Sequence, residues 1–211
     1  MRDLIEAAES GNDARLEELF RTRGSFLARS HLHDGRTLLH VAGSRAVAEL
    51  LVLYGANVMA RSHGPGPLRG DTPLHAAIRR RRIEVAEWLI ARGVDTNAVN
   101  DVGWTPLHLA AANGEPDLAR TLLLNGARAD ARTALDTPRA PAGSLAIDLA
   151  RDVMARRDDG RLVEPGTMDM LVRMLGGAGK RREPAAAPAP RRSSFTRRLV
   201  ERLSRIAAAW F

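Results

Sequence analysis

Three histidines recur along the chain and are the first candidates for chemistry. His75 and His108 each follow a Thr-Pro-Leu sequence, and His40 follows Thr-Leu-Leu. Histidine is a frequent general base and metal ligand, so a recurring histidine could indicate catalysis or a metal site. The three copies stand on successive repeated segments, about one repeat apart. This spacing places them too far apart to share one metal ion.

Other residue patterns that support catalysis or metal binding are missing. The chain has no cysteine, which excludes disulfides, thiolate metal sites and cysteine nucleophiles. His31, His33 and His63 lie in or near turns, without a carboxylate or cysteine at metal-ligand spacing beside them. The sequence Gly-Pro-Gly-Pro at 64–67 cannot cradle a phosphate, because proline lacks the necessary N–H group. We therefore predict a protein that is not an enzyme and uses no cofactor or metal.

The elements that would position these histidines are pairs of short helices. In residues 101–127, Thr105 is placed to cap a helix whose first residue is Pro106. Gly114 ends that helix, Pro116 opens a second one, and Gly126 ends it. Neither helix can bury its apolar face alone. The unit therefore requires neighbours of its own kind.

Such neighbours are present. The Thr-Pro-Leu-His sequence recurs from Thr72, 33 residues before Thr105, and a copy without the proline begins at Thr37. This motif and its period resemble the ankyrin repeat. Weaker copies at 4–20 and 145–175 extend the resemblance over residues 1 to about 175. It implies an all-α fold with short β-turn fingers, an ankyrin-repeat solenoid of about five helix-turn-helix repeats, at 1–33, 34–68, 69–101, 102–134 and 143–175.

The repeats are not uniform. His40 and Gly55 are 15 residues apart, where the two following repeats have 18, so we expect shortened helices in the second repeat. Arg81 stands where the fourth repeat has a glycine, and a left-handed backbone there would cost about 1 kcal/mol. Insertions lengthen the turns at 60–70 and 131–143. The closing helix of the last repeat is expected to begin near Thr167, with Met168, Leu171, Val172 and Leu175 sealing the stack.

The formal charge of +7 is confined to the end of the chain. Residues after position 175 include nine basic and two acidic residues, so residues 1–175 are formally neutral. A nucleic-acid-binding surface should be strongly basic, and we therefore do not expect the array to bind nucleic acid. The first residues are too polar for a signal peptide, and no apolar run is long enough to span a membrane. We expect a cytoplasmic, monomeric protein.

The resemblance also implies where a partner would bind. In ankyrin proteins the fingers and the exposed faces of the first helices form a concave groove for a partner protein, and the recurrent histidine ties neighbouring turns together. The run Arg79 to Arg82 is either part of that surface or a solvated turn. Trp104 is either an exposed anchor or a cover for the next turn. By position, the predicted groove residues are Arg36, Arg69, Asp71, Arg79, Arg80, Val102, Trp104, Ala112 and Asn113.

A linker and an amphipathic segment follow the array. Residues 176–192 are rich in Gly, Ala, Pro and basic residues and predict a flexible linker. A helix over residues 193–211 would gather its apolar side chains on one face, with arginines beside them. This C-terminal amphipathic helix could dock on the last repeat, enter a groove in a second partner, or lie on an anionic membrane. The contact residues would be Phe195, Leu199, Leu203, Ile206, Trp210 and Phe211, with Arg198, Arg202 and Arg205.

Three functional hypotheses remain open at this point. The first is a non-catalytic protein-binding module whose tail attaches reversibly to a membrane surface or a second partner. The second is a secreted bacterial ankyrin effector with a basic C-terminal export signal. The third is a regulatory subunit whose tail inhibits its own groove.

Overall fold

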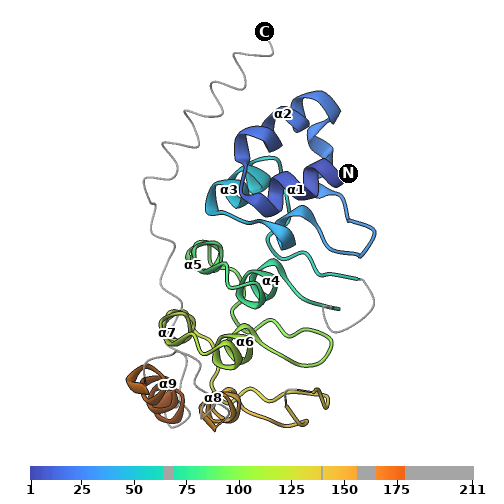
Figure 1. Cartoon of the computed structure of the whole chain (residues 1–211). Helices are drawn as coiled ribbons and strands as arrows, with labels where there is room; N and C mark the ends of the chain where they lie inside the picture. The colour runs from blue at the N-terminus through green and yellow to red at the C-terminus, as the bar shows by residue number, and fades with distance from the viewer. Residues whose placement is uncertain (64–68, 139, 156–164, 179–211) are drawn as a thin grey trace.

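The computed structural model describes residues 1–63, 69–138, 140–155 and 165–178. Figure 1 shows that these residues form a stack of helical hairpins joined by extended turns. The elements are α1 (Arg2–Ser10), α2 (Asp13–Arg23), η1 (Ser25–Arg29), η2 (Leu38–Val41), α3 (Arg45–Leu53), α4 (Pro73–Arg79), α5 (Ile83–Ala91), α6 (Pro106–Asn113), α7 (Pro116–Leu124), α8 (Ala146–Ala155) and α9 (Pro165–Ala178), where η denotes a 3-10 helix.

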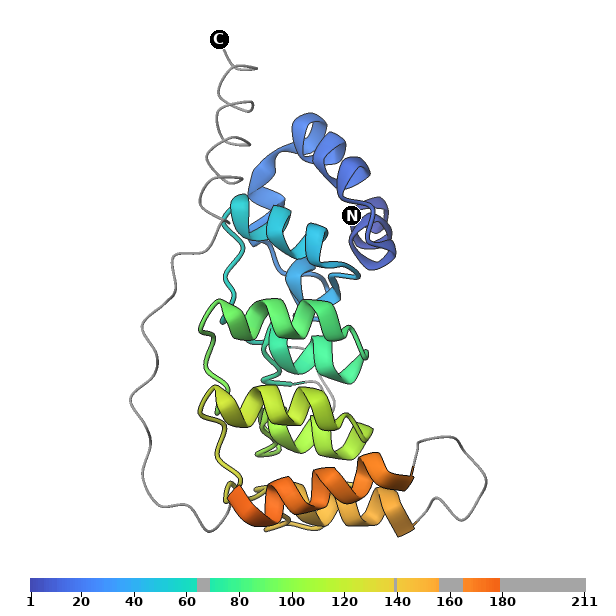
Figure 2. The same ribbon diagram turned by 90° about the vertical axis from the view of Figure 1, so that its left-hand side faces the viewer.

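The helices stack in two layers. The first helices of successive repeats, α1, η2, α4, α6 and α8, pack on one another, and α3, α5, α7 and α9 form the second layer, visible in Figure 2. The described residues contain isolated β-bridges but no strand. This arrangement confirms the predicted all-α solenoid.

Local signals set the helix boundaries in the third and fourth repeats. Thr72 and Thr105 cap α4 and α6 through their hydroxyl groups, and a proline is the first residue of each helix. Gly114 ends α6 in the left-handed conformation at φ 70°. Arg81 adopts the same conformation at φ 55°. Its guanidinium reaches Glu115 at 3.4 Å and the Asn113 carbonyl, contacts to the next repeat that offset part of the backbone cost.

The shortening of the second repeat falls entirely in its first helix. The segment η2 is a single turn of 3-10 helix, whereas α3 has nine residues, as α5 and α7 do. As a result, the Gly43 N–H donates to the Ala8 carbonyl at 2.7 Å. Arg80 of the third repeat also reaches Glu9 of the first at 2.9 Å. Repeats in a solenoid normally contact only their neighbours, so this ion pair crosses a repeat.

The last repeat closes the stack with a longer helix than expected. Helix α9 begins at Pro165, two residues before the predicted start, and runs three residues past the predicted end of the array. Leu171 and Leu175 are buried, as predicted, and Val172 is half-buried. The side chains of residues 165–169, and with them the Thr167 cap and Met168, lie outside the description. The remaining linker and the predicted helix over 193–211 also lie outside the described residues.

Leucine and alanine side chains form one core that runs through the stack. Small alanines such as Ala86, Ala110 and Ala119 are fully buried, which lets neighbouring helices approach closely. Among the helices that the structure describes, none is both long and apolar enough to cross a membrane.

Candidate protein-binding surface

The recurrent histidines fix the turns from which the inner face is built. In each repeat the histidine Nδ1 accepts a hydrogen bond from the backbone N–H of the threonine three residues earlier. Because Nδ1 is an acceptor, the ring proton lies on Nε2, which donates to a carbonyl of the following repeat. The acceptors are Asp71 at 2.9 Å from His40, Trp104 at 2.9 Å from His75, and Ser144 at 3.3 Å from His108. These contacts confirm the tying role and leave no ring nitrogen of these three histidines for a metal.

Burial keeps these histidines neutral. Desolvation lowers the pKa of His40 from 6.5 to about 4, against opposing contributions from the Asp71 carbonyl and carboxylate. Desolvation likewise lowers the pKa of His75 and of His108. The side chains therefore act as fixed hydrogen-bonding groups at neutral pH.

Two further histidines lie side by side at the finger turns. The rings of His31 and His63 are tilted by 42° to each other with centroids 5.4 Å apart, and both side chains are exposed. Within the described ranges, no group of three His, Cys, Asp or Glu side chains is arranged to hold a metal ion.

A small hollow on the inner face gathers four of the nine predicted groove residues. It holds about 40 Å³ and lies between the second and third repeats. Arg36, Asp71, Arg79 and Arg80 line it, together with His40, Ser62 and Ala76, which were not among the predicted groove residues. The hollow lies beside a first helix of only one turn, so the 15-residue spacing in the second repeat is the sequence signal from which it could have been found.

The three arginines that line this hollow pair with carboxylates that differ in their exposure to solvent. Arg79 pairs with Asp71, which is 2% exposed and also accepts a hydrogen bond from the Asn100 side chain at 2.8 Å. Arg36 and Arg80 pair instead with Asp34 and Glu9. Those two carboxylates are 48% and 41% exposed.

This difference determines the charge that a partner would meet. The Arg36 and Arg80 side chains are themselves only 19% and 33% exposed, but their carboxylate partners reach solvent, and ion pairs at the surface contribute only about 1 kcal/mol, so another carboxylate can compete for these two guanidinium groups. The buried Asp71 cannot be exchanged in this way. The residues lining the hollow carry three guanidinium groups and one carboxylate, and His40 is neutral. In the free chain each guanidinium group is balanced by a carboxylate, and the lining becomes cationic only when Asp34 or Glu9 is displaced, so a partner carboxylate would bind by taking the place of one of them.

The other predicted groove residues lie apart from the hollow. Arg69 is at a finger tip, where it pairs with Asp101 at 2.9 Å. The half-buried Val102 occupies the next finger, and its carbonyl accepts hydrogen bonds from the insertion that follows. Ala112 and Asn113 are half-buried at the end of α6, and the Asn113 side chain donates to the Ile78 carbonyl at 2.7 Å. Asn113 thereby joins two repeats.

The structure corrects the proposed surface role of Trp104. Its side chain is 4% exposed, so it cannot act as an exposed anchor. The ring lies 6.4 Å from that of His108. Its indole Nε1 is buried and has no hydrogen-bond partner among the described residues. Burial also removes the Asp71 side chain from direct contact with a partner.

The unsatisfied indole N–H leads to a stability prediction. Trp104→Phe should change the free energy of unfolding by less than about 1 kcal/mol, because removal of the unsatisfied donor offsets the lost apolar area. Trp104→Ala, which also creates a cavity, should cost about 3–5 kcal/mol. Urea unfolding of the two variants tests this. Equal destabilisation by both substitutions would contradict the assignment.

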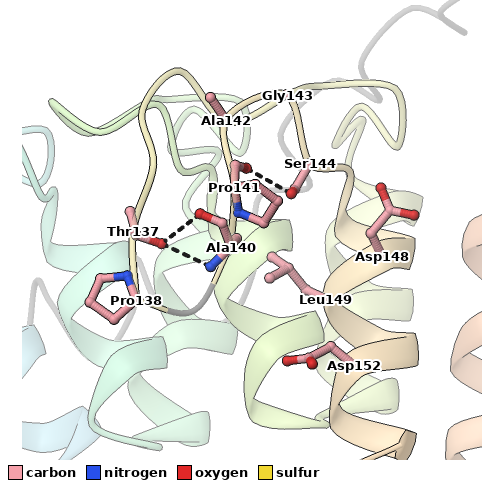
Figure 3. A pocket seen from close by; sticks show the side chains of 10 residues that line it. All are labelled: Thr137, Pro138, Ala140, Pro141, Ala142, Gly143, Ser144, Asp148, Leu149 and Asp152. Atoms are coloured by element: carbon pink, nitrogen blue, oxygen red, sulfur yellow. Dashed lines mark hydrogen bonds between the residues drawn. The ribbon is translucent and has the colours of Figure 1, made fainter.

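A larger pocket lies at the other end of the inner face. It holds about 510 Å³ between the insertion at 131–143 and helix α8. Figure 3 shows Pro138, Ala140 and Pro141 on the loop side, with Leu149 and two aspartates on the helix side. The predicted groove residues are not among those that line it. The sequence signal for it was the insertion itself, which lengthens a turn beside an inner helix.

The comparisons with known proteins agree with this architecture. A family model described as ankyrin repeats (3 copies) matches residues 4–100 and 43–133, more than half of the chain. Human protein phosphatase 1 regulatory subunit 27 is 40% identical over 62 residues, covering 29% of this chain and 40% of that protein. The I-Kappa-B like protein C2 of Microplitis demolitor bracovirus is 28% identical over 121 residues, covering 54% and 65%.

A third relative is a much larger protein than this chain. Human neurogenic locus notch homolog protein 1 is 41% identical over 100 residues, covering 46% of this chain and 4% of that protein. The chain thus spans less than two thirds of the length of each of these relatives. The family match, the repeated capping motif and the two-layered stack agree with one another, and the chain belongs to the ankyrin repeat family.

Proposed function

We propose that this protein is a non-catalytic binding module that holds an acidic segment of a partner protein in its concave groove. Ankyrin repeat proteins bind partner proteins, and the observation that supports this site is the small hollow between the second and third repeats. Three guanidinium groups line it, and two of them are held only by exposed carboxylates. A partner carboxylate can replace those ligands without disturbing the buried Asp71.

The test is affinity capture from the native host with the full chain and charge variants. Arg36→Glu combined with Arg80→Glu should reduce the captured amount of the specific partner at least about tenfold, since attraction becomes repulsion at the centre of the contact. Arg79 is left intact because it neutralises Asp71. Arg82→Glu is the matched control, because Arg82 is an exposed residue of the same basic run and does not line the hollow.

The capture experiment has one outcome that supports the proposed site and one that overturns it. Loss of one partner in the double variant, with retention in the control, supports the site. Unchanged capture of every partner would overturn the proposal. Thermal unfolding of both variants should match that of the natural chain, which ensures that lost binding does not reflect unfolding.

The tail is the remaining part of the proposed function. The separation of arginines from apolar residues in the sequence of 193–211 favours reversible attachment to an anionic membrane surface or a second partner. This support comes from the sequence alone. The same apolar face would be used by any of these contacts, so only one of them can form at a time.

A further inference from the structure

One of the three arginines that line the hollow between the second and third repeats is paired with a residue of the first repeat. Arg80, which follows α4, donates to the Glu9 carboxylate, with 2.9 Å between Nη1 and Oε1. Glu9 lies in the last turn of α1, 71 positions earlier in the chain. The other two arginines pair with carboxylates two and eight positions away. The carboxylate that balances Arg80 is therefore brought to it by the stacking of the repeats.

Arg36 is held more firmly by Asp34 than Arg80 is by Glu9. The Asp34 carboxylate accepts hydrogen bonds from the Arg36 backbone N–H at 3.1 Å and from its Nε at 2.7 Å, and the Arg36 Nη2 lies 2.6 Å away. The hydrogen bond from the Arg36 side chain is the largest cause of the lowered pKa of Asp34. Within the described ranges, a single hydrogen bond joins Glu9 to Arg80. A partner carboxylate therefore displaces Glu9 more easily than Asp34.

Helix α1 does not need this ion pair to keep its place in the stack. Its buried side chains belong to the core, and the Gly43 N–H donates to the Ala8 carbonyl at 2.7 Å. Glu9 is itself 41% exposed at its side chain. A change of the Glu9 rotamer is thus enough to free Arg80, while α1 stays docked.

The hollow has room for one small acidic group beside Arg80. At about 40 Å³ it exceeds the roughly 15 Å³ that a single water molecule requires, and it admits a group the size of a carboxylate. Glu9 is not among the described residues that line it. Glu9 therefore balances the charge of Arg80 from beside the hollow and does not fill it.

We propose that Glu9 is a built-in competitor of the partner protein for Arg80. The inference rests on the proposed function and specifies its contact: a Glu or Asp side chain of the partner replaces Glu9 on Arg80, while Asp34 stays on Arg36. The partner meets an unbalanced guanidinium group only after Glu9 has moved away. The first repeat therefore lowers the affinity of a site that lies between the second and third repeats.

A titration of the full chain with a peptide of six glutamates, blocked at both ends, tests this proposal. The readout is the side-chain Nε–Hε signals of Arg80 and Arg36 in isotope-labelled protein. A site-resolved signal is needed because the arginines after residue 178 also attract the peptide. In the natural chain the Arg80 signal should shift as hexaglutamate is added, and the Arg36 signal should not. A peptide of six glutamines should shift neither signal.

Glu9→Gln is the decisive variant, because it keeps the size of the side chain and removes its charge. Half-saturation at Arg80 should then occur at about fivefold lower hexaglutamate concentration, the factor that corresponds to about 1 kcal/mol for a surface ion pair. Glu6→Gln is the matched control, since Glu6 is an exposed residue of the same helix and its substitution removes the same charge. The control should change the half-saturation by less than about twofold, because solvent screens charges at a distance.

The other outcomes each overturn the inference in a recognisable way. Equal half-saturation at Arg80 in the natural chain and in Glu9→Gln would show that Glu9 does not compete, and the proposed function would still stand. An Arg80 signal that stays fixed in both chains would remove the carboxylate site, and the proposed function with it. A shift of the Arg36 signal in place of the Arg80 signal would identify Asp34 as the displaced group. An equal gain in Glu6→Gln would reduce the effect to net charge.

Discussion

Lowering the pH from 7 to 4 is expected to destabilise the array by several kcal/mol. The unfolded chain binds a proton at each histidine near pH 6.5, whereas folded His40 does so only at about pH 4. Between those values the unfolded state binds more protons, so stability falls as pH falls. His40 alone accounts for up to about 3 kcal/mol. The lowered pKa values of His75 and His108 add to the effect in the same direction.

Urea unfolding at intervals between pH 7 and pH 4 measures this dependence. His40→Gln should reduce the slope, because it removes the group whose pKa burial lowers to about 4. Asp34 and Asp130 have pKa values lowered below 3.8 by hydrogen bonds to neighbouring arginines, so their contributions are lost mainly at lower pH. A free energy of unfolding that stays constant down to pH 4.5 would contradict the burial of neutral histidines.

Gly43→Ala is expected to cost at least about 3 kcal/mol and to loosen the first repeat. An added Cβ would lie 2.0 Å from the Glu9 carbonyl oxygen and 2.7 Å from its carbon. Both are backbone atoms at the end of α1, so relief requires that the helix move away. That movement breaks the hydrogen bond from the Gly43 N–H to Ala8.

Gly93→Ala provides the matched control for this substitution. Gly93 has a φ of 73° but no atom within 4 Å of an added Cβ, so only backbone strain of about 1 kcal/mol is expected. Hydrogen exchange of the α1 amides should accelerate in Gly43→Ala and not in Gly93→Ala. Equal destabilisation of the two variants would show that close packing on α1 is unimportant.

The sequence alone determined the features that depend on residues close together in the chain. Thr105 and Pro106 start α6, and Gly114 ends it, because caps, proline geometry and the left-handed conformation act within a few residues. Arg81 was correctly placed in a left-handed turn for the same reason. The repeat period then implied the stack, since each helical pair has an apolar face that only a neighbour can cover. The sequence alone also shows that residues 1–175 are formally neutral and that the excess positive charge lies after them.

Only the tertiary structure decided which of the candidate groove residues form a site. For Trp104, which follows a finger turn, the sequence left both an exposed and a covered position open, and in the folded chain it is buried with its ring 6.4 Å from that of His108. Asp71 is buried by Arg79 and by Asn100, which is 29 residues away. Arg80 forms an ion pair with Glu9, 71 residues earlier in the chain, because the helix that lies between them, η2, is a single turn. The large pocket likewise requires the inserted loop to fold beside α8. These contacts depend on how repeats stack, and local sequence rules do not specify that geometry.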